Sequence, residues 1–369
     1  MSFECNVCHC RDTIRSVIRG DGQNVLFCGD CGLGMIENPP DCTQHFYQDS
    51  YYGQTQGDEA GYADYGFTAE HALLWPRLMI EALKPPPARV LDVGCADGFL
   101  LHRLVGGYEL YGIEANSTAA AVAKARGVEI LTGDIADPVI AEGRIGRFDA
   151  ITSIATFEHV LDLSGAFSIC LDLLRPDGAI LFELPLVSPD ENQRAWLDSS
   201  YEHIYYPTES GIRRLLEMAP SLHYCLFEAK INGFDPTIIG MATRDIATYG
   251  RMQRLVTAMT QDGLDGLDIA ETQLNLAFHV VHSFNATPER ILALPTLFEV
   301  AFAPNLLKRL TQLWYSDAVL AKECRDAKAE ASARAAAEAE AAALPFAKLT
   351  KGITRARRIL GGIKRRLVG

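Results

Sequence analysis

The sequence contains no apolar run that could cross a membrane, because no stretch approaches the roughly 18 uninterrupted apolar residues that a spanning helix needs. The first ten residues, MSFECNVCHC, lack the basic and then apolar pattern of a secretory signal. Positive charge is scarce as well: 34 Lys and Arg stand against 47 Asp and Glu, a formal net charge of -13. This balance argues against a polyanion as the main partner. We therefore expect a soluble, cytoplasmic protein that binds no nucleic acid.

The chain has 369 residues, of which 48% are hydrophobic, so it is long enough for about two domains and can bury a sizeable core. Composition divides it into six segments. We expect a cysteine-rich module over 1–45, an aromatic linker and leading helix over 46–85, an α/β domain over 86–246, a helical region over 247–320, an Ala/Glu-rich helix over 321–345, and a basic tail over 346–369.

The α/β segment alternates short β-branched, apolar runs with helical patterns, which is typical of parallel β-α units. The pattern predicts seven strands, at 88–93, 109–114, 128–133, 148–154, 179–185, 223–231 and 237–244. Between the last two strands, Asn232-Gly233 and Asp235-Pro236 are turn residues and leave no room for a helical crossover. We therefore expect a mixed sheet with an antiparallel hairpin at one edge.

Cysteine is concentrated at the start of the chain, where two CxxC pairs are separated by 19 residues. Each pair can supply two thiolates from one tight turn, and zinc bound tetrahedrally needs four such donors. The spacing predicts a structural zinc ion held by Cys5, Cys8, Cys28 and Cys31 in a zinc ribbon. His9 or Cys10 could take the place of one ligand.

A glycine-bearing loop follows the first strand of the α/β segment, in the sequence DVGCADGF over 92–99. Glycines at 94 and 98 let a ligand approach the backbone at the carboxyl edge of the sheet. A dinucleotide fold requires a third small residue, and Phe99 occupies that place, so an NAD-dependent oxidoreductase is disfavoured. The carboxylate of Asp92 suits a ligand with a cationic amino-acid end.

Five segments in order resemble the motifs of class I S-adenosylmethionine-dependent methyltransferases: 92–98, Glu114, 133–135, 148–160 and 174–179. The resemblance implies a Rossmann-like fold for the α/β segment, which lies between the zinc ribbon predicted from the cysteine spacing and the helical C-terminal region predicted from the sequence pattern. It also implies that Glu114 binds the ribose hydroxyls and Asp134 the adenine amino group. The cofactor-binding residues it points to are Asp92, Gly94, Ala96, Gly98, Glu114, Asp134, Ile135 and Ala155, with Ala96 replacing a common glycine.

The order of a CxxC…CxxC module, the FYxxxYYG pattern and this domain resembles bacterial sugar and surface-polysaccharide methyltransferases. In sugar C-methyltransferases of similar layout, a Tyr-x-Glu-His stretch supplies the acid and base. Here Glu202 and His203 are kept, while Ser200 stands at the Tyr position.

Methyl transfer to a sugar hydroxyl requires removal of a proton, and His is the usual base near neutral pH. Two histidines are candidates: His203, oriented by Glu202, and His159, which follows the fourth strand. The leading hypothesis is O-methylation of a sugar, in a nucleotide-sugar or a glycan. C-methylation of a keto-deoxysugar nucleotide and a non-enzymatic zinc-ribbon scaffold remain alternatives.

The C-terminal segments offer two further interactions. The Ala/Glu-rich helix has few large apolar side chains, and we expect it to protrude, where it could mediate oligomerisation. The basic tail could form an amphipathic helix on an anionic membrane surface, remain solvated, or dock on the acidic body. Tyrosines between residues 47 and 65 could close over the substrate or pack the zinc module on the domain.

Overall fold

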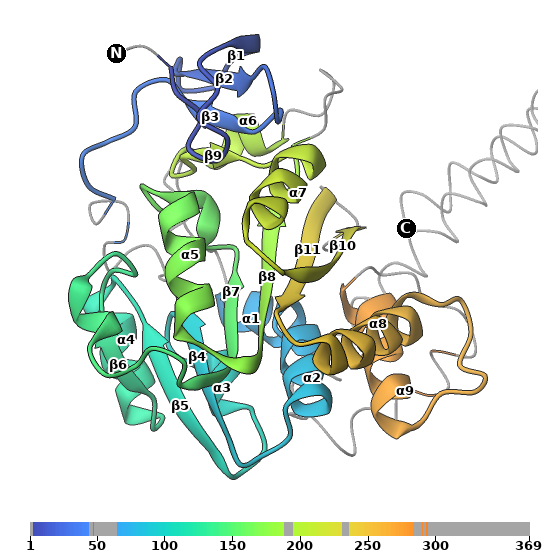
Figure 1. Ribbon diagram of the computed structural model, residues 1–369. Helices are drawn as coiled ribbons and strands as arrows, with labels where there is room; N and C mark the ends of the chain where they lie inside the picture. The colour runs from blue at the N-terminus through green and yellow to red at the C-terminus, as the bar shows by residue number, and fades with distance from the viewer. Residues whose placement is uncertain are drawn as a thin grey trace, which may run out of the picture. The chain divides into compact units, whose positions relative to one another are not determined.

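Seven strands form one sheet in the computed structural model, which describes residues 3–43, 47, 65–187, 195–230, 236–282, 290 and 293. The order across the sheet is β10-β11-β8-β7-β4-β5-β6 (Figure 1). Strands β4 to β8 run parallel, whereas β11 is antiparallel to both β8 and β10. This confirms the mixed sheet with an antiparallel hairpin at one edge. The strands are β4 (Ala88–Val93), β5 (Tyr108–Ile113), β6 (Glu129–Thr132), β7 (Phe148–Ile154), β8 (Leu174–Pro185), β10 (His223–Lys230) and β11 (Pro236–Thr243).

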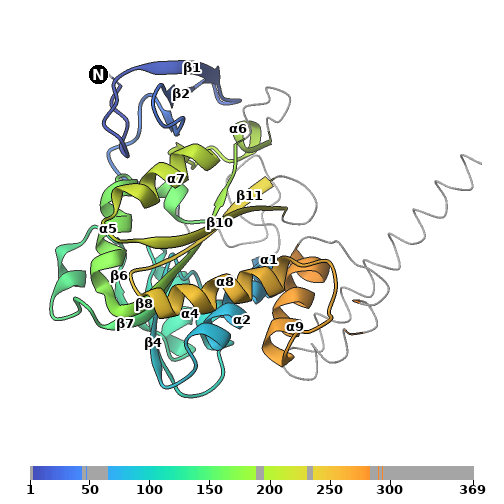
Figure 2. The same ribbon diagram turned by 45° about the vertical axis from the view of Figure 1, so that its right-hand side comes forward.

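Helices cover both faces of this sheet, and their first turns are capped by side chains that the sequence places there. Asn116, Asp162 and Thr208 each accept a hydrogen bond from a backbone N–H in the first turn of α4, α5 and α7. Figure 2 shows α5 and α7 on one side of β10 and β11, with α2 and α8 on the other. The helices of this part are α1 (Tyr65–Ala72), α2 (Leu74–Leu83), α3 (Phe99–His102), α4 (Ser117–Ala125), α5 (Leu163–Leu173), α6 (Ala195–Ser199) and α7 (Glu209–Met218), with short 3-10 turns η3 (Pro138–Ala141) and η4 (Phe157–His159).

The strand order reverses direction around β4, which lies between β5 on one side and β7 on the other. In open α/β sheets, the loops that follow the strands on either side of such a point separate and leave a crevice. The loop after β4 and the η4 turn after β7 lie at this edge. The topology therefore places the glycine-bearing loop beside the segment that carries His159.

The N-terminal module forms a second, four-stranded sheet with the order β1-β2-β3-β9. Three strands come from the module itself: β1 (Thr13–Ile18), β2 (Asn24–Cys28) and β3 (Gly34–Ile36). The fourth, β9 (Tyr205–Tyr206), comes from the loop after α6 and pairs antiparallel with β3. The sequence pattern did not predict this strand, and it ties the module to the α/β domain.

Two other elements differ from the sequence-based expectation. The helix expected over 68–83 is interrupted at Leu73, between α1 and α2. Strand β8 begins at Leu174, five residues before the strand expected over 179–185. Along β7, Phe148 pairs with Leu174 and Ala150 pairs with Ala179. Residues 175–178 of β8 therefore form a bulge between these two pairs.

Beyond the sheet, the described chain is helical: α8 (Ile246–Thr260), α9 (Ile269–Leu276) and the π-helical turn η5 (Ala277–His282). A capping box between Asp268 and Glu271 begins α9. No helix in the described part of the chain is long and apolar enough to span a membrane. The Ala/Glu-rich helix, the basic tail and most of the tyrosine-rich linker lie outside the described residues.

Candidate functional site

One cavity of about 480 Å³ opens at the carboxyl edge of the sheet, where the strand order reverses. It is lined by residues from the ends of β4, β5, β7 and β8, from α1, and from the loop before β9. The cavity brings together nearly all the cofactor-binding and catalytic residues that the sequence predicts. Those that line it are Asp92, Gly94, Ala96, Glu114, Asp134, Ile135, Ala155, His159, Glu202 and His203. Gly98 is not among the lining residues.

The loop after β4 adopts a conformation that favours glycine at three positions. Gly94 has a φ of +77°, and a Cβ there would lie 2.3 Å from Thr156 Oγ1. Gly98 has a φ of +74° and precedes the first turn of α3. Ala96 has a φ of 47°, a left-handed conformation that is strained for a residue with a Cβ. The replacement of the family's glycine by Ala96 therefore keeps the loop shape at an energetic cost.

Asp92 is a buried carboxyl at the end of β4, and its Oδ1 accepts a hydrogen bond from Thr152 Oγ1 at 2.7 Å. Burial raises the pKa of Asp92 to about 7, against the opposing effect of the Thr152 hydrogen bond, and the nearby Glu114 raises it further. A cationic ligand in the cavity would favour the ionised form of this carboxyl.

Glu114 and Asp134 lie at the ends of neighbouring strands and border the same part of the cavity. The Glu114 carboxylate accepts hydrogen bonds from the backbone N–H of Ala96, at 2.8 Å, and of Asn116, at 2.7 Å. It thus fixes the loop after β4 from the tip of β5. Asp134 is exposed and accepts from the backbone N–H of Ala136 at 2.9 Å. A bent glycine loop and two carboxylates at adjacent strand ends fit a ligand that carries a cationic amino-acid end and a ribose.

At the other end of the cavity, a cluster of buried ionisable side chains comes from two separate segments. Glu158 and His159 belong to the η4 turn, whereas Glu202 and His203 belong to the loop before β9. Glu158 Oε1 lies 3.6 Å from His159 Nε2 and 4.0 Å from His203 Nε2, and the two imidazole rings meet edge to face at 4.8 Å. Ligand atoms of these three residues lie within 4.8 Å of one another, a spacing that a metal ion could also accept.

Burial determines the protonation of this cluster. It lowers the pKa of His159 to about 4 and the pKa of His203 well below its ordinary value, where the nearby His159 and Arg19 add to the effect. It also raises the pKa of Glu158 well above the ordinary range, with Glu183 and Glu202 adding to the rise. Both imidazoles are therefore neutral near pH 7 and can accept a proton.

The hydrogen bonds of the cluster are incomplete. His159 Nδ1 lies 3.4 Å from the Glu202 carbonyl oxygen, which can only accept, so this nitrogen carries the proton and Nε2 presents its lone pair towards Glu158. Polar atoms of Glu158, Glu202 and His203 are buried without a hydrogen-bond partner in the part of the chain that the structure describes. Since buried polar groups are normally paired, this end of the cavity is suited to a polar ligand.

The cluster differs from the sequence-based expectation in its pairing. We expected Glu202 to orient His203, but the carboxyl group beside His203 Nε2 is that of Glu158, and His203 Nδ1 has no hydrogen-bond partner among the described residues. A carboxyl group from a separate segment of the chain therefore faces this ring nitrogen. Glu183, at the end of β8, is a further buried carboxyl that sequence reasoning missed. It accepts from Trp75 Nε1 at 2.9 Å, and burial raises its pKa to about 8.

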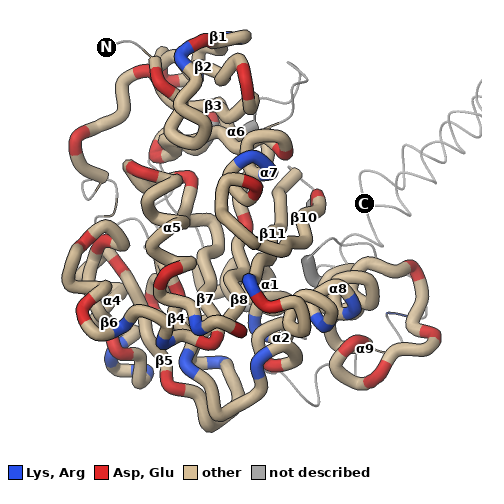
Figure 3. The backbone as a smooth tube through the Cα atoms, viewed as in Figure 1, with Lys and Arg blue, Asp and Glu red and all other residues tan. Residues whose placement is uncertain are grey.

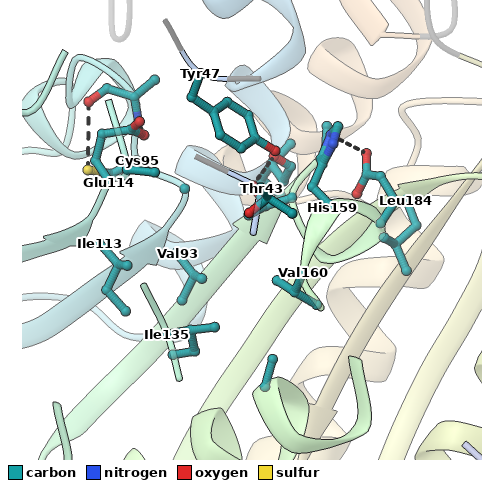
Figure 4. Close-up of a pocket in the computed structure, with 18 of the residues that line it drawn as sticks. Thr43, Tyr47, Val93, Cys95, Ile113, Glu114, Ile135, His159, Val160 and Leu184 are labelled. Carbon is teal, nitrogen blue, oxygen red and sulfur yellow. Dashed lines mark hydrogen bonds and ion pairs between the residues drawn. The ribbon is translucent and has the colours of Figure 1, made fainter. Parts of the chain in front are cut away.

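Tyr47 lies between the two ends of the cavity (Figure 4). Its carbonyl oxygen accepts a hydrogen bond from Asn116 Nδ2 at 3.0 Å, and its ring meets that of His159 edge to face at 5.9 Å. One of the tyrosines noted in the sequence therefore contacts both the N-cap residue of α4, two residues after Glu114, and the histidine cluster. Tyr51, Tyr52 and Tyr62 lie outside the described residues.

The four predicted zinc ligands form a separate cluster in the N-terminal module. Their sulfur atoms lie within 4.8 Å of one another, with Cys5 Sγ 3.6 Å from Cys31 Sγ and Cys8 Sγ 3.4 Å from Cys28 Sγ. Four sulfurs bound at about 2.3 Å from one ion lie roughly 3.8 Å apart, so the quartet fits tetrahedral zinc. Cys10 is not part of it, since its sulfur is directed at the Asp12 carbonyl.

Comparison with known proteins agrees with this geometry. Residues 66–219 match the family model described as a methyltransferase domain. Two curated relatives are ubiquinone biosynthesis O-methyltransferases: one from Alkalilimnicola ehrlichii, 32% identical over 118 residues, and one from Burkholderia vietnamiensis, 35% identical over 99 residues. These matches cover 31% and 26% of this chain, and 48% and 43% of the relatives, so the chain spans less than half the length of either.

Among solved structures, the YcgJ protein from Bacillus subtilis is 16% identical, with a TM-score of 0.38. That similarity covers 48% of this chain and 99% of the other. The family match over 66–219 coincides with the glycine loop, the acidic strand ends and the η4 turn that together form the cavity. Residues 66–219 are therefore similar in sequence to a methyltransferase domain.

Proposed function

We propose that this protein transfers a methyl group from S-adenosylmethionine to a hydroxyl of a sugar, in a nucleotide-sugar or at a glycan end. The observation that carries the proposal is the composition of one cavity: a cofactor end at the tips of β4, β5 and β6, and a buried Glu/His cluster at the other end. A transferable methyl group and a proton acceptor would thus be held in the same enclosed space. Such positioning is the main contribution a protein makes to an in-line transfer.

The cofactor end would be formed by seven of the eight residues predicted from the sequence, with Gly98 behind them in the loop after β4. Bound there, S-adenosylmethionine supplies an electrophilic methyl group. The protein's part is to hold the ligand: the loop from Asp92 to Gly98 leaves its backbone accessible, and Glu114 and Asp134 offer carboxylates at adjacent strand ends. Ile135 is buried beside them and gives the cavity an apolar wall.

In the proposed reaction, His203 accepts the proton of the acceptor hydroxyl, with His159 and Glu202 beside it. His203 is neutral near pH 7 because burial lowers its pKa, so it can accept a proton without first losing one. The imidazolium that forms then lies next to Glu158, whose Oε1 faces His203 Nε2 at 4.0 Å and can accept a hydrogen bond from its N–H. Glu158 thereby takes the supporting role that the sequence suggested for Glu202.

The N-terminal cysteine quartet is proposed to hold one structural zinc ion. Besides the sulfur spacing, the backbone N–H of Asp30 points at Cys28 Sγ at 3.4 Å, as expected of a thiolate in a zinc knuckle. Four sulfur donors leave no coordination position open, so the ion would contribute folding energy and no chemistry.

Phenolic hydroxyls are a second candidate acceptor class, because the curated relatives are named as O-methyltransferases of ubiquinone biosynthesis.

The charge distribution does not favour a highly anionic polymer as the acceptor. Figure 3 shows acidic residues along most of the described elements, with Lys and Arg in smaller groups. C-methylation of a keto-deoxysugar nucleotide stays open as the chemistry nearest to sugar O-methylation.

Calorimetric titration with S-adenosylmethionine, S-adenosylhomocysteine and NAD tests the cofactor first, with Glu114→Ala and His203→Ala as variants. Binding of both sulfur ligands at micromolar strength, weakened by Glu114→Ala and not by His203→Ala, is expected. Absence of binding to folded protein would contradict the enzyme reading and favour the scaffold alternative.

An acceptor panel of nucleotide-sugars, glycan ends and catechols, read by mass spectrometry, then tests the acceptor class. Methylation of sugars that is lost in His203→Ala supports the proposal, whereas methylation of catechols alone contradicts it. Exchange of a sugar α-proton with deuterated water in the absence of cofactor would indicate C-methylation instead.

A further inference from the structure

The loop that carries His203 is held by the N-terminal module on one side and by the η4 turn on the other. Residues directly after His203 form β9, which pairs with β3 through Gly34 and Met35. The backbone N–H of Ile36 donates to the carbonyl of Ile204 at 3.0 Å, and the N–H of Ile204 donates to the carbonyl of Glu158 at 2.9 Å. The cluster therefore forms only where the module meets the methyltransferase domain.

Arg19 of the module reaches this loop with its side chain. Its Nη1 donates to the carbonyl of His203 and to the hydroxyl of Tyr206, each at 3.0 Å. Its Nε and Nη2 donate to the carboxylate of Asp21, and its guanidinium lies 5.4 Å from the centre of the Tyr201 ring. The Arg19 side chain is only 2% exposed, so each of these contacts is made inside the protein.

We propose that Arg19 is a positioning residue for the acceptor end of the cavity, and that the N-terminal module is thereby part of the site. This inference rests on the proposed role of His203. A buried arginine is costly unless its donors are paired, and the donors of Arg19 are paired on one side by Asp21 and on the other by the loop. Removing the guanidinium leaves the His203 carbonyl, the Tyr206 hydroxyl and Asp21 without a shared partner.

The guanidinium also contributes charge to the cluster. The charged and titratable groups that face His203 are Glu158 and His159 from the η4 turn, Glu202 and Tyr206 from its own loop, and Arg19 from the module. Of these, Arg19 carries a permanent positive charge, which opposes protonation of His203. A role limited to folding would not predict a change in the proton affinity of one histidine.

The test follows the His203 ring by NMR as a function of pH in the full-length protein labelled at histidine, with His203→Gln identifying its signal among nine histidines. Arg19→Met should raise the proton affinity of His203 by about tenfold or more, because it removes a charge and admits water. Arg19→Lys should restore part of the difference. Arg15→Met is the matched control, since Arg15 stacks on Phe27 of the same module.

Hydrogen exchange and ligand binding complete the test. The amides of Ile204 and Tyr206 should exchange faster in Arg19→Met than in Arg15→Met, while affinity for S-adenosylhomocysteine stays unchanged in both. Tyr206→Phe removes only the hydroxyl that accepts from Arg19, and it replaces Arg19→Met in the experiment if Arg19→Met does not fold. The amides of Ile204 and Tyr206 should then exchange faster in this variant than in wild type.

Two results would overturn the proposal: a His203 titration and amide exchange that are the same in Arg19→Met and wild type, or an equal change in Arg15→Met. Unchanged exchange in Tyr206→Phe, where that variant carries the test, would overturn it as well. Failure of every protein to bind S-adenosylhomocysteine would instead reject the proposed function, and the effect of Arg19 on His203 would stand apart from it.

Discussion

At the scale of single residues, Ala96 combines a position in the cavity wall with an unfavourable backbone conformation. A left-handed φ costs a residue with a Cβ about 1–2 kcal/mol in the folded state. Glycine avoids this strain, but its greater conformational freedom in the unfolded chain offsets part of the gain. Ala96→Gly should therefore raise the free energy of unfolding by about 0.5–1 kcal/mol in denaturant titrations of the ligand-free protein. Ala121→Gly, in the exposed face of the right-handed helix α4, should lower it by a similar amount. Equal effects of the two variants would contradict the strain assigned to Ala96.

Asp92 gives the stability of the protein a dependence on pH. Its pKa rises from 3.8 to about 7 on folding, so between these values the folded chain keeps a proton that the unfolded chain releases. The free energy of unfolding therefore falls as pH rises through this window, and the loss is complete above about pH 7.

Asp92→Asn keeps an acceptor for Thr152 and cannot ionise. The variant should match wild type at pH 4 and exceed it by roughly 2–4 kcal/mol at pH 8, measured by denaturant unfolding without ligand. Asp137→Asn serves as the control. Hydrogen bonds from the backbone N–H of Val139 and the hydroxyl of Thr132 hold the pKa of Asp137 below this window. A pH profile of Asp92→Asn parallel to that of wild type would count against a protonated Asp92.

At the scale of elements, the pairing of β3 with β9 depends on the absence of a side chain at Gly34. A Cβ there would lie 2.8 Å from Tyr206 Cβ and 2.8 Å from Phe27 Cε1, closer than packed atoms approach. Gly34→Ala should lower the free energy of unfolding by about 1–3 kcal/mol. Gly250→Ala, in α8 with no atom nearby, should instead raise it by about 0.5–1 kcal/mol. Calorimetry of both variants checks the contrast, and a stabilised Gly34→Ala would argue against a tight β3–β9 pair.

At the scale of the whole molecule, the cysteine quartet should link metal content to the integrity of the acceptor end. Cys28→Ser replaces a soft donor and should abolish binding of the zinc ion proposed for the quartet, measured by elemental analysis, and lower the melting temperature clearly. Cys10→Ser should leave both unchanged, because the Cys10 sulfur is directed at a carbonyl outside the quartet. Zinc retained in Cys28→Ser and lost in Cys10→Ser would assign the ligand set differently.

The whole fold also shows which features could be predicted from the sequence. The seven strands could, because each is a continuous β-branched or apolar run bounded by turn residues, and the turn chemistry before Thr237 indicated the antiparallel edge. Strand β9 could not, since two tyrosines carry no periodicity and their partner strand lies far away in sequence. The contact between Glu158 and His203 could not be predicted either, because the two residues come from separate segments of the sequence. Residues that share a strand end or a motif are predictable, whereas partners brought together by tertiary pairing are not.

The β3–β9 pair also has a consequence for the order in which the protein is made. It joins residues about 170 positions apart in the sequence. Because the chain is synthesised from its N-terminus, β9 leaves the ribosome only after β4 to β8, the first five strands of the large sheet. Three ribbon strands can assemble early around their cysteines, as local contacts form fast. The acceptor end, in contrast, becomes complete only after residue 206 has left the ribosome. A shorter nascent chain already contains the carboxyl end of β4, but His203 is not yet held beside His159 by the β3–β9 pair.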